Sequence, residues 1–457
     1  MIFKYFHKAP AIILTSLLLC SCLRSNNDPT EYPHDPQIYS FSLSAKKDTA
    51  KLLSNTSFTI DQVNGVIFNR KPLPYQFRVD SAAMQLRSSN IYYSFSQVIL
   101  KLIPDSTYLW RGSSDSIPLN RLHQIITTAP DGNKTKSYTF ELHVYKQDPY
   151  ILSWEEITKD YRPLSLPVAA QKTLILGDRF FTCYRSGSDI KAITSSVSDG
   201  KTWTEIPVTG LPGTADLSTL TAAWDNLYML DTEKRLFHSS EGSHWQQVAT
   251  PLTVTALYGS LPSTEKKELL VAVTQNGTAR FAKTADFTEM NLLNVIPEDI
   301  PVKDFSVARV IASSSYAVRF ILLAGGSRMD GSASDEIFIL QEKGGGIAHI
   351  VSRRPNRTSL AGSTLFFYDD RPYLMTSVPT GKDHPETKNI LMYSDNFGMD
   401  WIVAKENQAF PAEFDVRTHA SIITDADHHI WIFGGISHAQ EQLTDVWRAK
   451  LNKFSMP

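Results

Sequence analysis

The chain has 457 residues, with 45 basic against 47 acidic side chains and a formal net charge of −2 at pH 7. This balance gives no reason to expect binding to nucleic acid or to an anionic membrane surface, so we expect no nucleic-acid partner. The length is typical of two or three globular domains, and hydrophobic residues make up 42% of the chain, which is enough to build their cores.

Residues 1–22 are predicted to be a targeting segment. Basic residues precede an apolar run at 11–19 that is too short to span a bilayer. The run ends in Leu19-Cys20-Ser21-Cys22, which resembles a bacterial lipobox, where a small residue precedes the cysteine that receives the lipid. Cys22 is therefore the predicted lipidation site and the expected membrane anchor. An ordinary secretory signal with incidental cysteines is the alternative.

Residues 23–36 are rich in Asn, Asp and Pro, a composition that predicts a flexible polar tether. With Cys22 lipidated, Cys183 is the one remaining thiol of the mature chain, so no intramolecular disulfide is expected. Cys183 lies in the apolar segment 179–184, and we expect it to be a small buried hydrophobic residue.

A first domain is expected at 37–147, where short segments alternate between apolar and polar residues. Such alternation, bounded by Asp, Asn, Gly and Pro, is typical of half-buried strands. About seven strands in a domain of this length predict an immunoglobulin-like sandwich, although the Cys-Trp-Cys pattern of true immunoglobulin domains is absent. A hairpin turn with Gly132 at positive φ is expected before the last strand. The clearest predicted strands are 39–43, 57–60, 65–68, 75–79 and 137–144.

The second domain, expected at 148–457, is a repeat array. An Asp-led turn recurs before an apolar strand, because an Asp carboxylate can accept hydrogen bonds from the backbone just ahead of it. The spacing of these turns predicts six repeats, two of them degenerate. The turns begin at Asp178, Asp225, Asp370 and Asp427.

Three segments resemble the Asp box of sialidase-like β-propellers, whose pattern is Ser-x-Asp-x-Gly-x-x-Trp. The glycine allows a sharp turn between strands, and the tryptophan fills the space beside it. In that family the box lies on the periphery of a blade and is structural, so we expect these residues to be fold markers. The segments are 196–203, 238–245 and 394–401.

Two further segments resemble kelch repeats, in which a Gly-Gly pair precedes an acidic-aliphatic-aromatic strand. Gly325-Gly326 precedes Glu336-Ile337-Phe338, and Gly434-Gly435 precedes Asp445-Val446-Trp447 at the same spacing. Together these marks predict an all-β chain with a six-bladed β-propeller. The expected blades are 168–211, 212–250, 251–297, 301–352, 357–410 and 416–451.

The last predicted blade lacks an outer strand of its own. The segment 151–157, Ile-Leu-Ser-Trp-Glu-Glu-Ile, is similar to the outer strands that end other repeats, such as Trp203-Thr-Glu-Ile and Trp245-Gln-Gln-Val. We therefore expect 151–157 to complete the last blade and lock the ring, which would leave only short, protected edges.

The whole layout resembles a family of uncharacterised Bacteroidetes-type lipoproteins with an immunoglobulin-like domain followed by a six-bladed propeller. This resemblance rests on the lipobox, the tether, the sandwich pattern and the repeats described above. The resemblance implies an outer-membrane lipoprotein of the cell envelope, with no known activity. Whether it would be on the periplasmic face or the cell surface stays open, because Leu-Arg-Ser-Asn-Asn, and not an acidic run, follows Cys22.

Candidate ligand-binding residues lie where innermost strands are expected to line a central channel. Arg357 and Arg417 occupy matching positions in Arg-Thr-Ser-Leu-Ala and Arg-Thr-His-Ala-Ser, and could grip a carboxylate or phosphate. Arg162, in Tyr-Arg-Pro-Leu, is the nearest match to a sialidase arginine motif, and His419 follows Arg417 closely. The alternative is that the arginines cap turns or pair with acidic neighbours such as Asp415.

No catalytic set, metal motif or phosphate-cradling loop is recognisable, so we expect no metal and no cofactor. The preferred hypothesis is a non-catalytic envelope lipoprotein whose propeller binds a glycan or an envelope protein partner. The alternative hypothesis is a glycan-active enzyme, either a sialidase-like hydrolase or a sugar mutarotase, with its site at the channel mouth. The sequence decides neither the ligand nor the oligomeric state.

Overall fold

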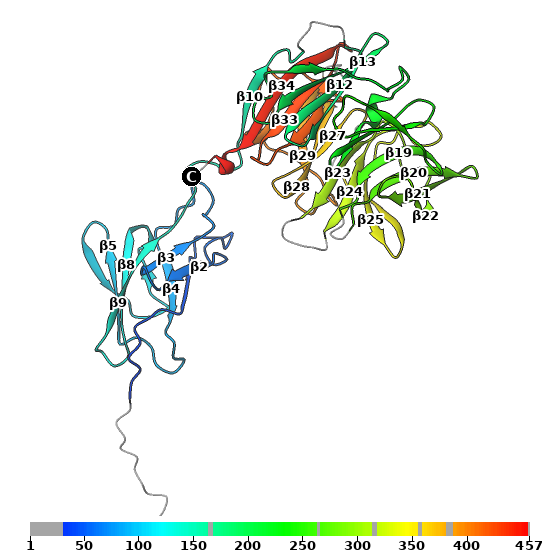
Figure 1. Ribbon diagram of the computed structural model, residues 1–457. Helices are drawn as coiled ribbons and strands as arrows, with labels where there is room; N and C mark the ends of the chain where they lie inside the picture. Colours follow the sequence, from blue (N-terminus) through cyan, green and yellow to red (C-terminus); the bar gives the residue numbers. More distant parts are fainter. Residues whose placement is uncertain are drawn as a thin grey trace, which may run out of the picture. The chain divides into compact units, whose positions relative to one another are not determined.

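The computed structural model describes residues 31–162, 168–262, 266–312, 318–354, 359–380 and 387–455. The chain divides into two compact units, one ending at Asp148 and the other beginning at Pro149. Both are all-β, with four short 3-10 helices, η1 (Leu119–Arg121), η2 (Leu217–Thr219), η3 (Glu406–Gln408) and η4 (Asn452–Phe454), in the described ranges (Figure 1). The expected targeting segment with Cys22, and residues 23–30 of the expected tether, lie outside the described residues.

The N-terminal unit consists of two sheets that enclose one apolar core. The smaller has the strand order β1-β4-β7 and the larger the order β2-β3-β9-β8-β5-β6, with β3 and β9 parallel. Alternate residues of these strands are buried, as in the pattern exposed-buried-intermediate-buried of β1. The strands are β1 (Ser40–Ser44), β2 (Phe58–Asp61), β3 (Val66–Asn69), β4 (Ala82–Arg87), β5 (Gln97–Leu102), β6 (Ser106–Leu109), β7 (Ser116–Ile117), β8 (Leu122–Thr128) and β9 (Thr135–Glu141).

One expected strand of this unit, 75–79, is wrong. The chain there makes a turn closed by a hydrogen bond from Phe77 N to the carbonyl of Pro74, with Gln76 at a φ of 64°. Phe77 and Val79 nevertheless pack against the core. Apolar and polar residues do alternate in 75–79, but the segment forms a turn and not a strand. The expected hairpin turn before β9 is present, with Gly132 at a φ of 80°.

In its described residues, the C-terminal unit contains six antiparallel sheets. Five of them lie within expected repeat ranges, and the sixth adds the strand at 152–158 to those of the range 416–451. Five of them follow the chain in simple order, four strands to a sheet. Their strands are β11 (Ala170–Leu176), β12 (Arg179–Ser186), β13 (Asp189–Ser196), β14 (Thr204–Ile206); β15 (Thr221–Ala223), β16 (Asn226–Leu230), β17 (Leu236–Ser239), β18 (Gln246–Val248); β19 (Thr253–Ser260), β20 (Leu269–Gln275), β21 (Thr278–Thr284), β22 (Asn291–Val295); β23 (Ser306–Ile311), β24 (Arg319–Ala324), β25 (Ile337–Lys343), β26 (Gly346–Val351); and β27 (Thr364–Tyr368), β28 (Arg371–Pro379), β29 (Thr387–Tyr393), β30 (Ile402–Val403).

The sixth sheet joins the two ends of this unit. It contains β10 (Leu152–Thr158), β31 (Arg417–Thr418), β32 (Ser421–Thr424), β33 (Ile430–Ser437) and β34 (Gln442–Leu451). β10 pairs with β34 in antiparallel register from Leu152 opposite Leu451 to Thr158 opposite Val446. The segment 151–157 thus lies at the outer edge of the last sheet, where its sequence places it; we call this sheet the closing sheet.

The first strands of the sheets face one another around a common axis. β11 contacts β15, β15 contacts β19, and the sequence of contacts continues through β23, β27 and β32 back to β11. Apolar cores fill the spaces between successive sheets, including one between the closing sheet and the first sheet, where Phe180 and Trp431 meet edge to face at 4.9 Å. The side chains between sheets therefore hold the ring together, because burying their apolar surface is the main stabilising term.

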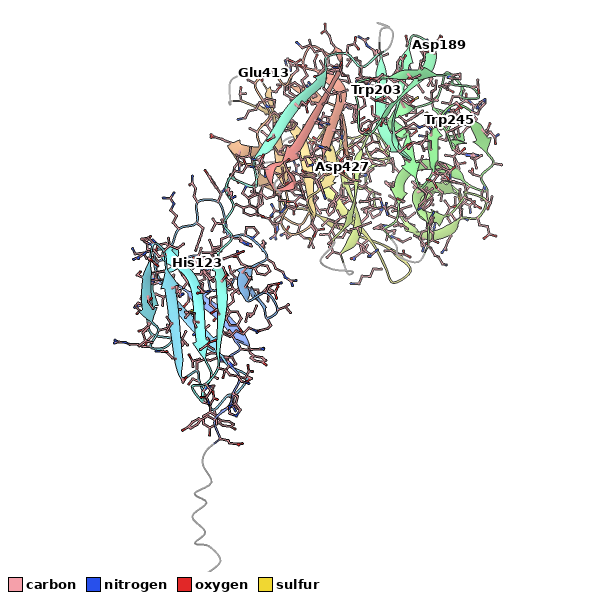
Figure 2. The ribbon with its side chains drawn as sticks, turned by 60° about the vertical axis from the view of Figure 1, so that its left-hand side comes forward. His123, Asp189, Trp203, Trp245, Glu413 and Asp427 are labelled. Atoms are coloured by element: carbon pink, nitrogen blue, oxygen red, sulfur yellow. The ribbon has the colours of Figure 1, made fainter. Side chains whose placement is uncertain are left out.

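Two of the three segments that resemble Asp boxes form the same kind of turn at sheet interfaces, whereas the indole nitrogen of Trp401 in the third is buried without a partner in the described structure. The indole nitrogens of Trp203 and Trp245 donate to the carbonyls of Gly200 and Gly242, at 3.0 and 2.9 Å, in successive sheets (Figure 2). Both glycines have positive φ, and a Cβ on Gly242 would lie 2.2 Å from the Phe181 ring of the preceding sheet. These residues position one sheet on the next and line no cavity of the channel.

Cys183, in β12, has no exposed surface. Burial raises the pKa of its thiol to about 12, which leaves it uncharged and unreactive at neutral pH. The expectation of a buried small hydrophobic residue is confirmed.

Candidate functional site

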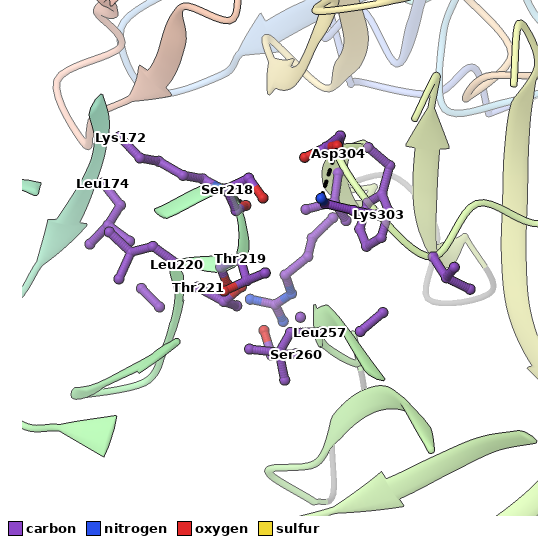
Figure 3. Close-up of a pocket in the computed structure, with 17 residues that line it drawn as sticks. Lys172, Leu174, Ser218, Thr219, Leu220, Thr221, Leu257, Ser260, Lys303 and Asp304 are labelled. Carbon is purple, nitrogen blue, oxygen red and sulfur yellow. Dashed lines mark hydrogen bonds and ion pairs between the residues drawn. The ribbon is translucent and has the colours of Figure 1, made fainter. Parts of the chain in front are cut away.

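Two adjoining hollows lie where the first strands surround the axis, and we call them together the channel cavity. Their volumes are about 250 Å³ and about 310 Å³. Both are lined by Lys172 of β11, by Ser218, which precedes β15, and by Val307 of β23. Figure 3 shows Lys172 and Ser218 in the first hollow. The second hollow also reaches the start of β27 and the break between β31 and β32.

Lys172 projects into the cavity from the first sheet. Its Nζ donates a hydrogen bond of 2.6 Å to the carbonyl of Ser218. Burial of the ammonium lowers its pKa to about 8, although the carboxylates of Asp216 and Asp304 act in the opposite direction. The side chain is therefore still cationic at neutral pH, and its charge is held in a partly desolvated position.

Arg309, in β23, supplies the second cation of the wall. Within the described ranges its guanidinium has no hydrogen-bond or ion-pair partner. Desolvation alone lowers its pKa, and no carboxylate offsets this effect. Since an arginine stays protonated in any case, this is a full positive charge placed in the channel wall without a protein counter-charge.

Asp304 is the only carboxylate among the described residues that line the cavity. The ammonium of Lys303 lies 4.0 Å from its carboxylate, an ion pair shown in Figure 3. Asp304 is close enough to raise the pKa values of both Lys172 and His419. One carboxylate thus stands near three nitrogen bases, and the wall keeps an excess of positive charge.

His419 lines the second hollow from the closing sheet. It sits between β31 and β32 with a φ of 55°, and its backbone N–H donates to the carbonyl of Gly362 at 2.7 Å. Desolvation lowers the pKa of the imidazole, so the ring is neutral at pH 7. A neutral imidazole can both donate and accept a hydrogen bond.

Arg417 has a different environment from the one expected for a ligand-binding residue. Its side chain has no exposed surface, and it forms a bidentate pair with Asp445 at 2.6 and 2.7 Å. The remaining donors reach the carbonyls of Asp415 and Gly434. This geometry corresponds to the structural alternative, with Asp445 as the acidic partner. The guanidinium is used within the closing sheet and does not reach the cavity.

The other two predicted arginines do not join the cavity in the described structure. Arg162 pairs with Asp160 at 2.9 Å and is not among the residues that line the channel cavity. Arg357 lies outside the described residues. Of the four candidates, His419 alone is placed in the cavity wall by the structure.

Sequence reasoning missed Lys172 and Arg309, although a signal for each was present. Both are single charged residues inside short apolar strands, in Lys172-Thr-Leu-Ile-Leu and Ala308-Arg-Val-Ile. A charge in such a strand needs a polar surface to face, and the first strand of a repeat offers one at the axis.

The described ranges contain neither a metal-binding cluster nor a membrane-spanning helix. No group of three or more His, Cys, Asp or Glu side chains there is arranged to hold a metal ion. None of the described helices has both the length and the apolar character needed to cross a bilayer.

Two family models cover this chain. The model described as the DUF6242 beta propeller domain matches residues 148–456, and that of the N-terminal domain of unknown function (DUF6242) matches residues 39–142. The chain belongs to the DUF6242 family. Its C-terminal unit is therefore a β-propeller domain, which accounts for the ring of sheets around the channel cavity. No curated protein matches the chain.

Several solved structures are similar in fold to this DUF6242 chain at low identity. YjhT has 13% identity and a TM-score of 0.43, with 64% of this chain and 96% of YjhT covered. A protein of unknown function from Dyadobacter fermentans has 10% identity and a TM-score of 0.43, covering 65% of this chain and 99% of its own. Trypanosoma rangeli sialidase has 9% identity and a TM-score of 0.41, with 66% and 60% covered.

Proposed function

We propose that this protein is a non-catalytic binding protein whose ligand is held in the channel cavity of its propeller. The observation that carries the proposal is the wall itself, where polar and cationic groups from several sheets converge on one hollow. Small-ligand sites are typically concave, largely apolar, and marked by a few convergent polar groups. A glycan or a fragment of one fits such a cavity better than a protein surface does.

The architecture behind the proposal is a six-bladed propeller that follows an immunoglobulin-like domain. The six sheets, the contacts from each first strand to the next, and the pairing of β10 with β34 support a closed ring. Closure supports binding, because it brings Lys172 and Arg309, which both lie on strands, to one cavity from different sheets.

We further propose that a lipid on Cys22 anchors the protein to the cell envelope, at the outer membrane. Its support is the lipobox-like sequence that ends in Ser21-Cys22 and the polar segment that follows it. Metabolic labelling with a clickable fatty acid tests this: the wild type should incorporate label and the Cys22→Ala variant should not.

The enzymatic alternative has less support in the cavity. A glycosidase of the usual kind needs two carboxyl groups across the scissile bond. Asp304 is the only carboxylate of the described cavity lining, and no described tyrosine lines it. Binding without turnover is therefore the function that the geometry supports best.

A variant that fills the cavity tests the proposal. Val307 lines both hollows, so Val307→Trp should obstruct them, whereas Val351→Trp places the same bulk on the exposed outer strand β26 of the same sheet. Val307→Ala serves as a milder second change if the tryptophan is not tolerated. Calorimetric titration with glucose, galactose, N-acetylglucosamine and glucuronate gives the affinities, and methylumbelliferyl glycosides report any hydrolysis.

Sugar binding that Val307→Trp abolishes and Val351→Trp preserves, without hydrolysis, supports the proposal. Hydrolysis that Val307→Trp abolishes establishes the enzymatic alternative instead. Equal binding by both variants, or no binding of any of the four sugars, overturns the channel cavity as a glycan site.

A further inference from the structure

We infer that the channel cavity binds a carboxylate sugar, whose carboxylate is held by Arg309 and Lys172. This inference rests on the proposed function and names the ligand class for that site. It differs from the arginine set expected from the sequence, since neither Arg417 nor Arg162 takes part.

The first argument is that Arg309 places an accessible positive charge on the wall of the first hollow. Its side chain is exposed and has no described partner, so its guanidinium donors are available to an anion that enters the hollow. No described carboxylate pairs with it, whereas Arg417, Arg353 and Arg235 all have carboxylate partners. A planar guanidinium matches the two oxygens of a carboxylate.

The second argument is the position of Lys172 on the same hollow. Its Nζ is fixed by one hydrogen bond to the carbonyl of Ser218, and two of its N–H donors are still available. Lys172 comes from the first sheet and Arg309 from the fourth, so a ligand between them would be held from two sides of the ring.

The third argument is the charge of the lining, which favours an anion. Lys172, Lys303 and Arg309 line the first hollow against one carboxylate, Asp304. Lys303 already pairs with Asp304, which leaves Lys172 and Arg309 for the ligand. Asp304 and the neutral His419 are also good partners for sugar hydroxyls, since one accepts and the other can do either.

The fourth argument is size and surface. The hollows are small, and each is large enough only for a ligand of monosaccharide scale. Leu174, Leu257 and Val307 supply apolar surface beside the polar groups. A pyranose ring presents C–H faces to such residues and hydroxyls to the others.

Glucuronate and glucose form the matched pair of probes, because they share a pyranose ring and differ in the carboxylate. The full chain is titrated with each, and with inorganic phosphate, as the wild type and as Arg309→Met, Lys172→Met and Arg353→Met. Arg353 is 81% exposed and pairs with Asp400 away from the cavity, so Arg353→Met is the control for loss of one positive charge. The methionine keeps the length of the replaced side chain.

We expect the wild type to bind glucuronate at least 10-fold more tightly than glucose. Arg309→Met should lower glucuronate affinity roughly 10- to 100-fold, as expected for loss of a hydrogen-bonded charge, with Lys172→Met next and Arg353→Met unchanged. Folding of each variant is checked by its thermal transition.

Three results would overturn it, and they separate it from the proposed function. Equal affinity for glucose and glucuronate, unchanged in Arg309→Met but lost in Val307→Trp, leaves the glycan site in place and refutes the carboxylate. Binding of phosphate alone, lost in Arg309→Met, refutes the carboxylate sugar as the ligand class. Glucuronate affinity that falls equally in Arg309→Met and Arg353→Met shows a general charge effect and refutes the assigned site.

Discussion

Arginine side chains have opposite environments in two regions of the propeller: the packed spaces between the sheets, and the channel that the sheets surround. In the closing sheet, the guanidinium of Arg417 is fully buried, paired with Asp445 and stacked 4.1 Å from the Phe414 ring centroid. In the channel wall, the guanidinium of Arg309 is exposed and has no described partner. The first arrangement pairs a buried charge, and the second leaves an accessible charge unpaired.

This difference indicates which region is shaped by folding and which by a ligand. An exposed cation without a protein partner adds little to stability, whereas breaking a buried pair from one side is costly. Variants that remove one charge or one packing contact from these regions should therefore differ in the size of their effect on stability.

The largest effect is expected for Arg417→Met. Without the guanidinium, the carboxylate of Asp445 keeps one described side-chain donor, the indole N–H of Trp447 at 2.7 Å. Breaking a buried pair from one side typically costs about 3–5 kcal/mol. Urea unfolding followed by tryptophan fluorescence measures the loss.

The matched control is Arg353→Met, which removes an arginine from an exposed pair with Asp400 and should cost about 1 kcal/mol or less. If the two losses are equal, the closing sheet does not depend on its buried pair, and the contrast drawn above fails.

The second effect concerns packing between sheets. Gly242→Ala puts a Cβ 2.2 Å from the ring of Phe181 at a φ of +84°, so the variant combines a clash with backbone strain. A loss of about 2–4 kcal/mol is expected from the two together. Gly277→Ala has a similar φ of +77° with no atom within 4 Å, so it isolates the strain and should lose about 1–2 kcal/mol. Equal losses would show that the turn does not fix one sheet on the next.

The sheets and the packing between them were the part of the propeller that the sequence could predict. Repeated turns at Asp178 and Asp225, the glycine-tryptophan segments, and the match between 151–157 and other outer strands are local patterns with local causes. The N-terminal unit was predicted less completely, because the alternation at 75–79 is compatible with a turn whose apolar side chains also face the core.

The channel wall was not predictable in the same way. Whether Arg417 or Arg309 faces the axis depends on the partner that each finds across the sheet, and Asp445 is 28 residues from Arg417 in sequence. A motif can place an arginine near the start of a strand. It cannot show which carboxylate neutralises it, and that pairing decides between a structural and a ligand-binding role.

The third effect is a pH dependence that belongs to Lys172. Its pKa is about 8 in the folded protein and about 10.4 when unfolded, so between these values the unfolded chain binds more protons and stability rises with pH. The rise is at most about 1.4 kcal/mol per pH unit. The raised pKa of Cys183 acts with the opposite sign above about 8.5, since the folded protein then holds the extra proton.

The Lys172 contribution is therefore read as a difference between wild type and Lys172→Met. Asp216, Asp304 and Lys303 also face this region, and they are common to both proteins. The difference in unfolding free energy should favour the wild type increasingly from pH 8 upward. A difference that does not vary with pH would show that Lys172 is not desolvated in the channel.

The smallest effect on stability is expected for Arg309→Met, and its smallness is the informative result. The change removes an exposed charge that has no described partner and keeps the aliphatic stem, so the free energy of unfolding should change by no more than about 0.5 kcal/mol. Affinity for glucuronate should fall in the same protein. Stability would then stay unchanged while affinity falls, which the loss of a buried pair such as that of Arg417 cannot produce. A stability loss approaching that of Arg417→Met, measured in the same urea titration, would show that Arg309 has a structural partner and that its charge is not kept for a ligand.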